Sequence, residues 1–132
     1  MKTLCTLLVF CLFILPLEAY ELKGRHTFGS YHECSEAALE DHCLLRQAFL
    51  HAIERAGLTP LSTCEQIFEN GDYSLVVLME NSHASLHTNR LSTSCFADFF
   101  TFDPTISSKR FDHDLIDYLN PGLSNYNTIE RN

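Results

Sequence analysis

The sequence predicts an α+β fold, a two-layer sandwich in which an antiparallel sheet carries helices on one face. Three observations support this. Stretches with helical spacing alternate with extended stretches in the order strand, helix, four strands, helix. Two turn sequences join neighbouring strands as hairpins, which requires antiparallel pairing. The 132 residues, 45% hydrophobic and 20% charged, suit one globular domain.

The first 19 residues are typical of an export signal rather than of the domain. Lys2 precedes an apolar run from Leu4 to Leu17, and Ala19 is the small residue expected before a cleavage site. The run is short for a membrane span, which needs about 20 residues. We therefore expect a signal peptide over residues 1–19 and an exported protein. An uncleaved membrane anchor and a cytoplasmic location are the alternatives.

The predicted domain begins with a short strand, Arg25 to Tyr31, followed by an amphipathic helix. Ser35 is the expected N-cap of this helix, and Gly57 ends its apolar pattern. Pro60 then opens an extended stretch to Phe68, which leads into the Asn-Gly pair of a hairpin turn.

A mostly apolar strand, Ser74 to Met79, follows that turn, and its composition predicts burial. After a break at Asn81-Ser82 come a strand over 84–88 and a second hairpin turn over 89–92. Ser94 to Thr101 is the last predicted strand.

The spacing of apolar residues from Phe111 to Leu119 predicts a second amphipathic helix, which Asn120-Pro121-Gly122 ends. The remaining residues, 123–132, are polar, and we expect them to form a flexible tail. The predicted domain therefore covers residues 20–122.

The acidic balance of the chain argues against a nucleic-acid partner. Its 17 Asp and Glu residues outnumber 9 Lys and Arg residues, for a formal net charge of −8. A nucleic-acid binder needs a basic surface to meet the phosphates. We expect no nucleic-acid partner.

Four cysteines follow the predicted signal: Cys34, Cys43, Cys64 and Cys95. In an exported domain they can form two disulfides in any of three pairings. Buried free thiols are the alternative. Because the sequence contains no Cys-x-x-Cys pair, we expect neither a structural zinc site nor any other metal site.

One segment combines residues that can carry chemistry. The strand from Ser74 leads into Ser82, which His83 and His87 follow. By residue type, Ser82 and His87 could be a hydrolase nucleophile and its base, but no Gly-x-Ser-x-Gly elbow surrounds the serine. His83 and His87 would share a strand face with Cα atoms about 13 Å apart, too far for one metal ion. A turn serine beside two structural histidines is the remaining alternative.

The same segment resembles the self-cleaving site of the short, prokaryotic-type S-adenosylmethionine decarboxylase proenzymes. The resemblance includes further landmarks in the family's order: Gly24-Arg25-His26, Tyr31-His32-Glu33-Cys34, Phe68, Ser74, Ser82-His83, Leu86-His87-Thr88 and Asp98-Phe99-Phe100-Thr101. It implies a pyruvoyl-dependent decarboxylase of polyamine (spermidine) biosynthesis with a small, amino-acid-type substrate. It also implies a homodimer or larger assembly with abutting sheets, in which each protomer is split into two chains.

The resemblance implies roles for individual residues. Ser82 would attack the carbonyl of Asn81, the chain would split between them, and Ser82 would become a covalent pyruvoyl group that forms a Schiff base with the substrate. Ser74 and His87 fall where the family keeps a processing serine and a processing proton acceptor. Phe68 matches a phenylalanine that stacks on the substrate adenine.

Three positions depart from the family's pattern. Asn81 stands where Glu is usual, Leu91 where a ribose-binding carboxylate is usual, and Phe102 where a cysteine normally reprotonates the product. These departures leave alternatives open. One is a pyruvoyl-dependent arginine or ornithine decarboxylase with an altered pocket, and another is a catalytically inactive, exported binding or partner paralogue. A third is a disulfide-bonded exported binding domain unrelated to polyamines.

Overall fold

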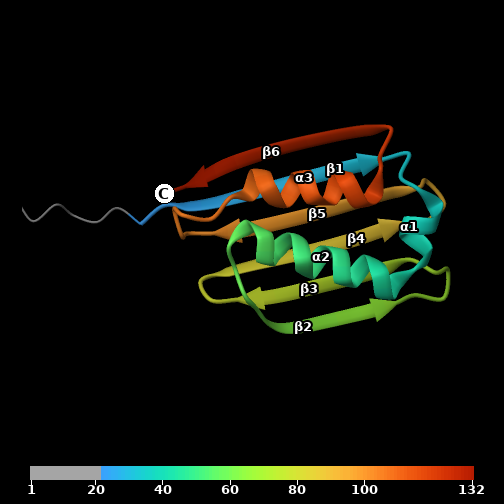
Figure 1. Ribbon diagram of the computed structural model, residues 1–132, viewed down its shortest axis with the longest axis horizontal. Helices are drawn as coiled ribbons and strands as arrows, with labels where there is room; N and C mark the ends of the chain where they lie inside the picture. The colour runs from blue at the N-terminus through green and yellow to red at the C-terminus, as the bar shows by residue number, and fades with distance from the viewer. Residues whose placement is uncertain (1–21) are drawn as a thin grey trace, which may run out of the picture.

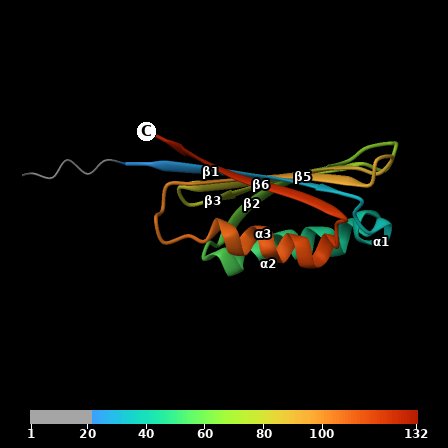
Figure 2. The ribbon, with the colours of Figure 1, turned by 90° about the horizontal axis from the view of Figure 1, so that it is seen from above.

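The computed structural model describes residues 22–132, so the predicted signal peptide lies outside the described residues. The elements in chain order are β1 (Gly24–His32), α1 (Glu36–Glu40), α2 (His42–Ala56), β2 (Pro60–Ile67), β3 (Tyr73–Met79), β4 (Ser82–Asn89), β5 (Ser94–Thr101), α3 (Ser108–Leu119) and β6 (Leu123–Arg131). The strands form one antiparallel sheet in the order β2-β3-β4-β5-β1-β6. The helices cover one face of it (Figures 1 and 2). The predicted α+β sandwich is confirmed.

The first predicted helix is divided in two at Asp41. This residue ends α1 and caps α2, because its carboxylate accepts a hydrogen bond from the backbone N–H of Leu44 at 2.9 Å. At the other end of α2, Gly57 adopts a φ of 111°, a left-handed conformation that glycine takes without steric cost. The predicted end of the helix is therefore confirmed.

The core lies between the helices and the covered face of the sheet. Alternate residues of each inner strand point toward α2 and α3, among them Leu75 and Phe99, both fully buried. The ring of Phe111 on α3 contacts Phe49 of α2 at 5.4 Å and Phe99 of β5 at 4.8 Å between centroids. These aromatic contacts join both helices to the sheet.

The opposite, open face of the sheet has no helix over it in the described part of the chain (Figure 2). Several large apolar side chains point outward there, including Val76, Leu78 and Phe96. The sequence prediction that the strand from Ser74 to Met79 is buried is therefore half wrong, because only its alternate residues face the helices.

The C-terminal residues form a strand, and the prediction of a flexible tail is wrong. β6 pairs with β1 along its whole length, from Gly24 opposite Arg131 to His32 opposite Leu123. The side chains of this edge strand are largely exposed on both faces of the sheet. Its sequence therefore lacks the alternation of apolar and polar residues that predicts a half-buried strand. The domain therefore extends through β6 rather than ending at residue 122.

The four cysteines of the described chain are free thiols. Cys34 and Cys95 are buried, whereas Cys43 and Cys64 are exposed. Burial raises the pKa of the Cys34 thiol to about 11. The buried-thiol alternative thus describes Cys34 and Cys95.

Within residues 22–132, no helix has the length and apolar character needed to cross a bilayer.

Candidate active site

The two residues expected to drive self-cleavage lie at opposite ends of β4. Ser82 begins the strand and faces the helices, whereas His87 lies five residues further on and faces the open side. At about 3.3 Å per residue the two Cα atoms are about 16 Å apart. The structure therefore does not bring Ser82 and His87 together within one chain.

Ser74 and His87, by contrast, form a hydrogen-bonded pair on the open face. They lie directly opposite each other on β3 and β4, and Ser74 Oγ is 2.7 Å from His87 Nδ1. This distance is that of an ordinary, well-formed hydrogen bond. The imidazole of His87 is exposed, and the contact with Ser74 orients its ring. We refer to Ser74 and His87 as the open-face dyad.

Phe68 lies at the same end of the sheet as the open-face dyad. It follows β2, its backbone N–H donates to the carbonyl of Asp72 at 2.9 Å, and its side chain is exposed. Leu91 lies in the turn after β4 and is 98% exposed. The resemblance residues therefore divide into two groups, with Phe68 and the open-face dyad at one end and Ser82 at the other.

The predicted cleavage site lies in the tight turn between β3 and β4. Met79 and Ser82 pair across this turn, and Asn81 adopts a left-handed φ of 58°. For most residues that conformation costs about 1–2 kcal/mol, and Asn tolerates it better than others. The peptide bond that would break follows directly after this unusual backbone conformation, which is a recurring property of reactive sites.

The hydroxyl of Ser82 is buried on the covered face and has one side-chain partner. Ser82 Oγ donates to Thr101 Oγ1 at 2.9 Å, and the backbone N–H of Asp103 donates to the same Thr101 oxygen at 3.0 Å. Thr101 belongs to the Asp98-Phe99-Phe100-Thr101 landmark, but no sequence pattern indicates a role for it. Its position opposite Ser82 in the β4–β5 register is what reveals the contact.

The loop after Thr101 is held firmly at the cleavage end. The Arg25 guanidinium donates to the carbonyls of Asp103 and Ile106 at 2.9 and 3.0 Å. The Thr105 hydroxyl and backbone N–H donate to the Asp103 carboxylate, and these bonds lower its pKa. Phe102, in place of the expected cysteine, lies in this loop and is partly buried.

A polar cleft of about 370 Å³ opens beside the same turn. It lies between the end of α2, the start of β2, the β3–β4 turn and the loop after β5, and Asn81 is part of its lining. Its lining is Gly57, Leu58, Thr59, Leu61, Glu80, Asn81 and Asp103.

A row of rings crosses the open face near the cleavage end. His83 of β4 stacks on Phe100 of β5 at 5.3 Å, and His26 of β1 meets the same ring edge-on at 6.2 Å. The Arg131 guanidinium lies 5.3 Å from the Phe100 centroid. The ring of His83 also lies 6.5 Å from that of His26, whereas His87, the second ligand considered from the sequence, lies about 13 Å further along β4.

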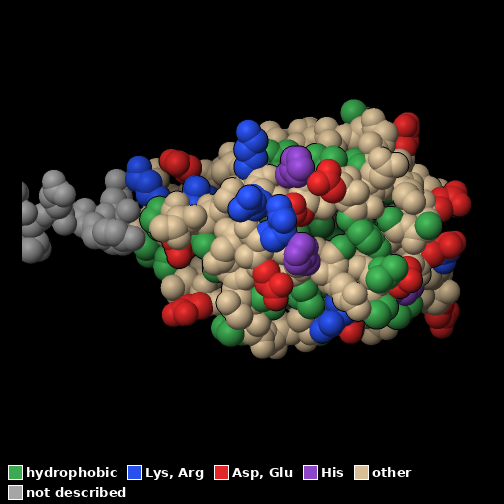
Figure 3. All heavy atoms as spheres, in the orientation of Figure 1, with side chains coloured by type: hydrophobic (Ala, Val, Ile, Leu, Met, Phe, Trp, Pro, Cys, Tyr) green, Lys and Arg blue, Asp and Glu red, His purple; other side chains and the backbone are tan. Residues whose placement is uncertain are grey.

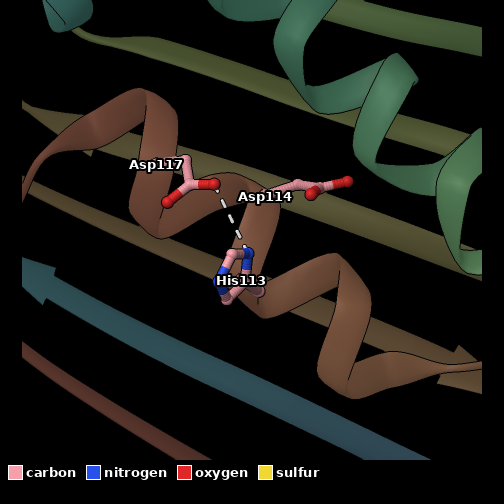
Figure 4. A group of neighbouring side chains, drawn as sticks. All are labelled: His113, Asp114 and Asp117. Carbon is pink, nitrogen blue, oxygen red and sulfur yellow. Dashed lines mark ion pairs between the residues drawn. The ribbon is translucent and has the colours of Figure 1, made fainter.

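One group of potential metal ligands within residues 22–132 lies elsewhere, on α3. His113, Asp114 and Asp117 offer ligand atoms within 4.8 Å of one another (Figure 4). Charged and histidine side chains gather over the helices on this side of the molecule (Figure 3). Asp114 is, however, already paired with Arg55 at 2.8 Å, and its side chain points away from the other two. The group is a charged surface of α3.

Comparison with known families and proteins gives a consistent result. A family model described as S-adenosylmethionine decarboxylase matches residues 25–132. Curated proteins named S-adenosylmethionine decarboxylase proenzyme are similar in sequence. That of Parasynechococcus marenigrum (strain WH8102) is 33% identical over 80 residues, or 61% of this chain and 62% of the relative. That of Synechococcus sp. (strain WH7803) is 30% identical over 93 residues, or 70% of this chain and 73% of the relative.

The fold also has solved counterparts. The adenosylmethionine decarboxylase of Aquifex aeolicus VF5 superposes with a TM-score of 0.75 at 24% identity, covering 84% of this chain and 92% of that one. The AdoMetDC-delta26 monomer of Trypanosoma brucei gives a TM-score of 0.55 at 9% identity, covering 77% of this chain and 44% of that one. At these identities the likeness establishes the architecture.

Proposed function

The chain belongs to the S-adenosylmethionine decarboxylase family, and from that premise we propose that it is a pyruvoyl-dependent decarboxylase proenzyme that cleaves itself between Asn81 and Ser82. The observation that carries the proposal is the open-face dyad, in which Ser74 Oγ and His87 Nδ1 are 2.7 Å apart. A serine and an accessible imidazole are kept in contact at the positions that the family uses for processing.

Self-cleavage requires no external reagent other than water. Ser82 Oγ forms a bond to the carbonyl carbon of Asn81, the C–N bond breaks, and the hydroxyl proton passes to the freed amine, which leaves an ester. A base then removes the Cα proton of Ser82, and the Asn81 carboxylate departs in β-elimination. The resulting dehydroalanine takes up water and loses ammonia to become the pyruvoyl group.

The pyruvoyl group supplies the electron sink for decarboxylation when it is formed. The substrate class is a small amino acid bearing a primary amine, with S-adenosylmethionine favoured and spermidine biosynthesis as the pathway. The exposed ring of Phe68 offers one stacking surface for an adenine. Arginine or ornithine is the alternative substrate, because Leu91 cannot supply a ribose-binding carboxylate.

We further propose that the protein acts as a homodimer whose open sheet faces meet. Since the open-face dyad lies about 16 Å along β4 from Ser82, it cannot serve the serine of its own chain. A two-fold axis across the open face would bring the partner's His87 toward the Asn81–Ser82 turn. The exposed Val76, Leu78 and Phe96 side chains give that face the apolar character an interface needs. Each protomer would then be split into two chains.

The N-terminal residues 1–19 are proposed to export the protein, on their sequence pattern alone. Fractionation of cells that express the full chain with a C-terminal tag tests this location. Recovery of the tagged protein in the cytoplasmic fraction with its N-terminus intact would contradict it.

The decisive experiment is the intact mass of the purified full chain, with Ser82→Ala as the control. We expect two fragments that separate at the Asn81–Ser82 bond, and a C-terminal fragment with a carbonyl that reacts with hydroxylamine. Ser82→Ala should remain one chain. An unsplit wild-type chain would refute self-cleavage.

Mixing two inactive variants tests the dimer arrangement. His87→Ala keeps Ser82, and Ser82→Ala keeps His87, so neither cleaves alone. If the dyad acts across the interface, a mixed dimer should cleave the His87→Ala chain only. Failure of every mixture to cleave, with mixed dimers shown to form, would place the dyad's action within one chain.

Release of CO₂ from labelled S-adenosylmethionine, arginine and ornithine then identifies the substrate. Activity with S-adenosylmethionine supports the favoured assignment, and activity with arginine or ornithine alone supports the altered pocket. A correctly split protein that releases no CO₂ from any of the three would support the inactive paralogue, which the replacement of the proton-donating cysteine by Phe102 favours.

A further inference from the structure

We propose that Thr101 is a positioning residue for self-cleavage, which holds the Ser82 hydroxyl in the orientation needed to attack the Asn81 carbonyl. This inference rests on the proposed function. Thr101 is buried opposite Ser82 on the covered face of the sheet, the face opposite to that of the open-face dyad.

The geometry of the contact leaves the Ser82 side chain little freedom. Ser82 and Thr101 lie opposite each other at the ends of β4 and β5, and both are buried, at 5% and 1% exposure. A serine hydroxyl has three staggered positions. In this dry environment the 2.9 Å hydrogen bond to Thr101 Oγ1 selects one of them, because an unpaired buried hydroxyl is costly.

Thr101 is itself held in place from two directions. As a β-branched residue in a strand it has a restricted χ1, and its Oγ1 also accepts the backbone N–H of Asp103 at 3.0 Å. The Asp103 loop is anchored in turn by Arg25. Because this acceptor is held in one position, it also restricts the orientation of the hydroxyl that donates to it.

The contact also suits the chemistry of the first step. Because Ser82 donates its hydrogen to Thr101, the lone pairs of Ser82 Oγ remain available for the carbonyl carbon of Asn81. The neutral threonine hydroxyl is not the base: the serine proton ends on the freed amine as the new C–O bond forms and the C–N bond breaks. Thr101 therefore positions Ser82 Oγ for the first step, the formation of the ester. The base acts in the second step, when it removes the Cα proton of Ser82.

The test compares three variants in cell-free synthesis, where the unsplit chain can be followed by mass from the start. Thr101→Val should slow cleavage by about 10- to 100-fold, as expected for a misplaced nucleophile, and Thr101→Ser should restore a rate close to wild type. Thr27→Val is the matched control. It removes another buried threonine hydroxyl of the covered face, which is 3.0 Å from Thr128 Oγ1, and should leave the rate unchanged.

A second readout separates positioning from a general loss of structure. In a His87→Ala background the ester cannot eliminate, so it accumulates and hydroxylamine cuts the chain there. Adding Thr101→Val should reduce that hydroxylamine-sensitive fraction, while adding Thr27→Val should not. Melting temperatures of the two valine variants show whether their stability losses are comparable. If Thr101→Val does not fold, Thr101→Cys is used in its place, because the cysteine sulfur accepts a hydrogen bond from Ser82 only weakly.

The outcomes distinguish this inference from the proposed function. Cleavage of Thr101→Val, or of its replacement, at the wild-type rate overturns the role of Thr101 and leaves self-cleavage standing. Slow cleavage of both Thr101→Ser and Thr101→Val also overturns the role of Thr101. A hydroxyl at position 101 would then not be sufficient to position Ser82. A wild-type chain that neither splits nor accumulates an ester overturns both.

Discussion

The covered and open faces of the sheet differ sharply, although the same strands supply both. In β3, Leu75 points toward the helices and is 0% exposed, whereas Leu78, three residues on, points outward and is 57% exposed. The covered face buries the core and the hydroxyl of Ser82, while the open face carries the open-face dyad and the ring row. The covered face therefore holds the core on which folding depends, whereas the open face exposes the side chains to which we assign proton transfer and dimer contact in the proposed function.

The largest effect should come from the open face. His87→Ala removes the proposed proton acceptor and should slow self-cleavage by about 10²- to 10⁴-fold. Ser74→Ala should have a smaller effect, because in the proposed mechanism Ser74 only orients the imidazole. The fragment yield after expression, followed by mass, measures both. Ser85→Ala is the control, since this serine lies on the same strand face and bonds Asp98 at 3.3 Å instead. Normal cleavage of His87→Ala would assign the chemistry to another group.

The paired leucines of β3 compare the faces most directly. Leu75→Ala should lower the free energy of unfolding by about 2–5 kcal/mol, because it leaves a cavity in the core. Leu78→Ala should change it by less than about 0.5 kcal/mol in the isolated chain but should weaken self-association. Urea unfolding measures the first effect and sedimentation the second. Equal destabilisation by both variants at a concentration where the protein is monomeric would contradict the division of the two faces.

The smallest expected effect concerns a polar contact inside the covered layer. The Tyr31 hydroxyl donates to Asp112 of α3 at 2.7 Å. Burial raises the pKa of Asp112 above its ordinary 3.8, although the hydrogen bond from Tyr31 opposes the rise. The folded state therefore holds this proton more tightly than the unfolded state does. The resulting stabilisation is complete below pH 3.8 and is lost as the pH rises through the folded pKa.

Asp112→Asn keeps an acceptor for Tyr31 and removes the titration. Thermal unfolding across this pH range should show that wild type loses stability relative to the variant as the pH rises. Asp117→Asn removes an exposed carboxylate from the same helix and is the control for the loss of one negative charge. Parallel profiles for wild type and Asp112→Asn would show that the carboxyl is not buried enough to matter.

Much of the fold could be predicted from local patterns. Helical spacing and the left-handed preference of Gly57 located α2, and the strand from Ser94 to Thr101 has the predicted bounds. The break at Asp41 and the strand β6 could not be predicted in this way. Asp41 caps a helix in the middle of a continuous apolar pattern, and β6 depends on pairing with β1, about a hundred residues earlier in the chain.

The candidate site shows the same division. The sequence by itself was sufficient to identify the family. It also predicts the residues at the processing positions and the three departures at Asn81, Leu91 and Phe102. Since side chains alternate along a strand, the odd separation of Ser82 and His87 places them on opposite faces once β4 is continuous.

Only the tertiary structure decided that β4 begins at Ser82, that Ser74 lies opposite His87, and that Thr101 accepts the Ser82 hydroxyl. Strand register is set by contacts between distant segments and by the core that the helices close over. A sequence pattern can therefore say which face a residue occupies, while its partner on the next strand is decided by the folded sheet.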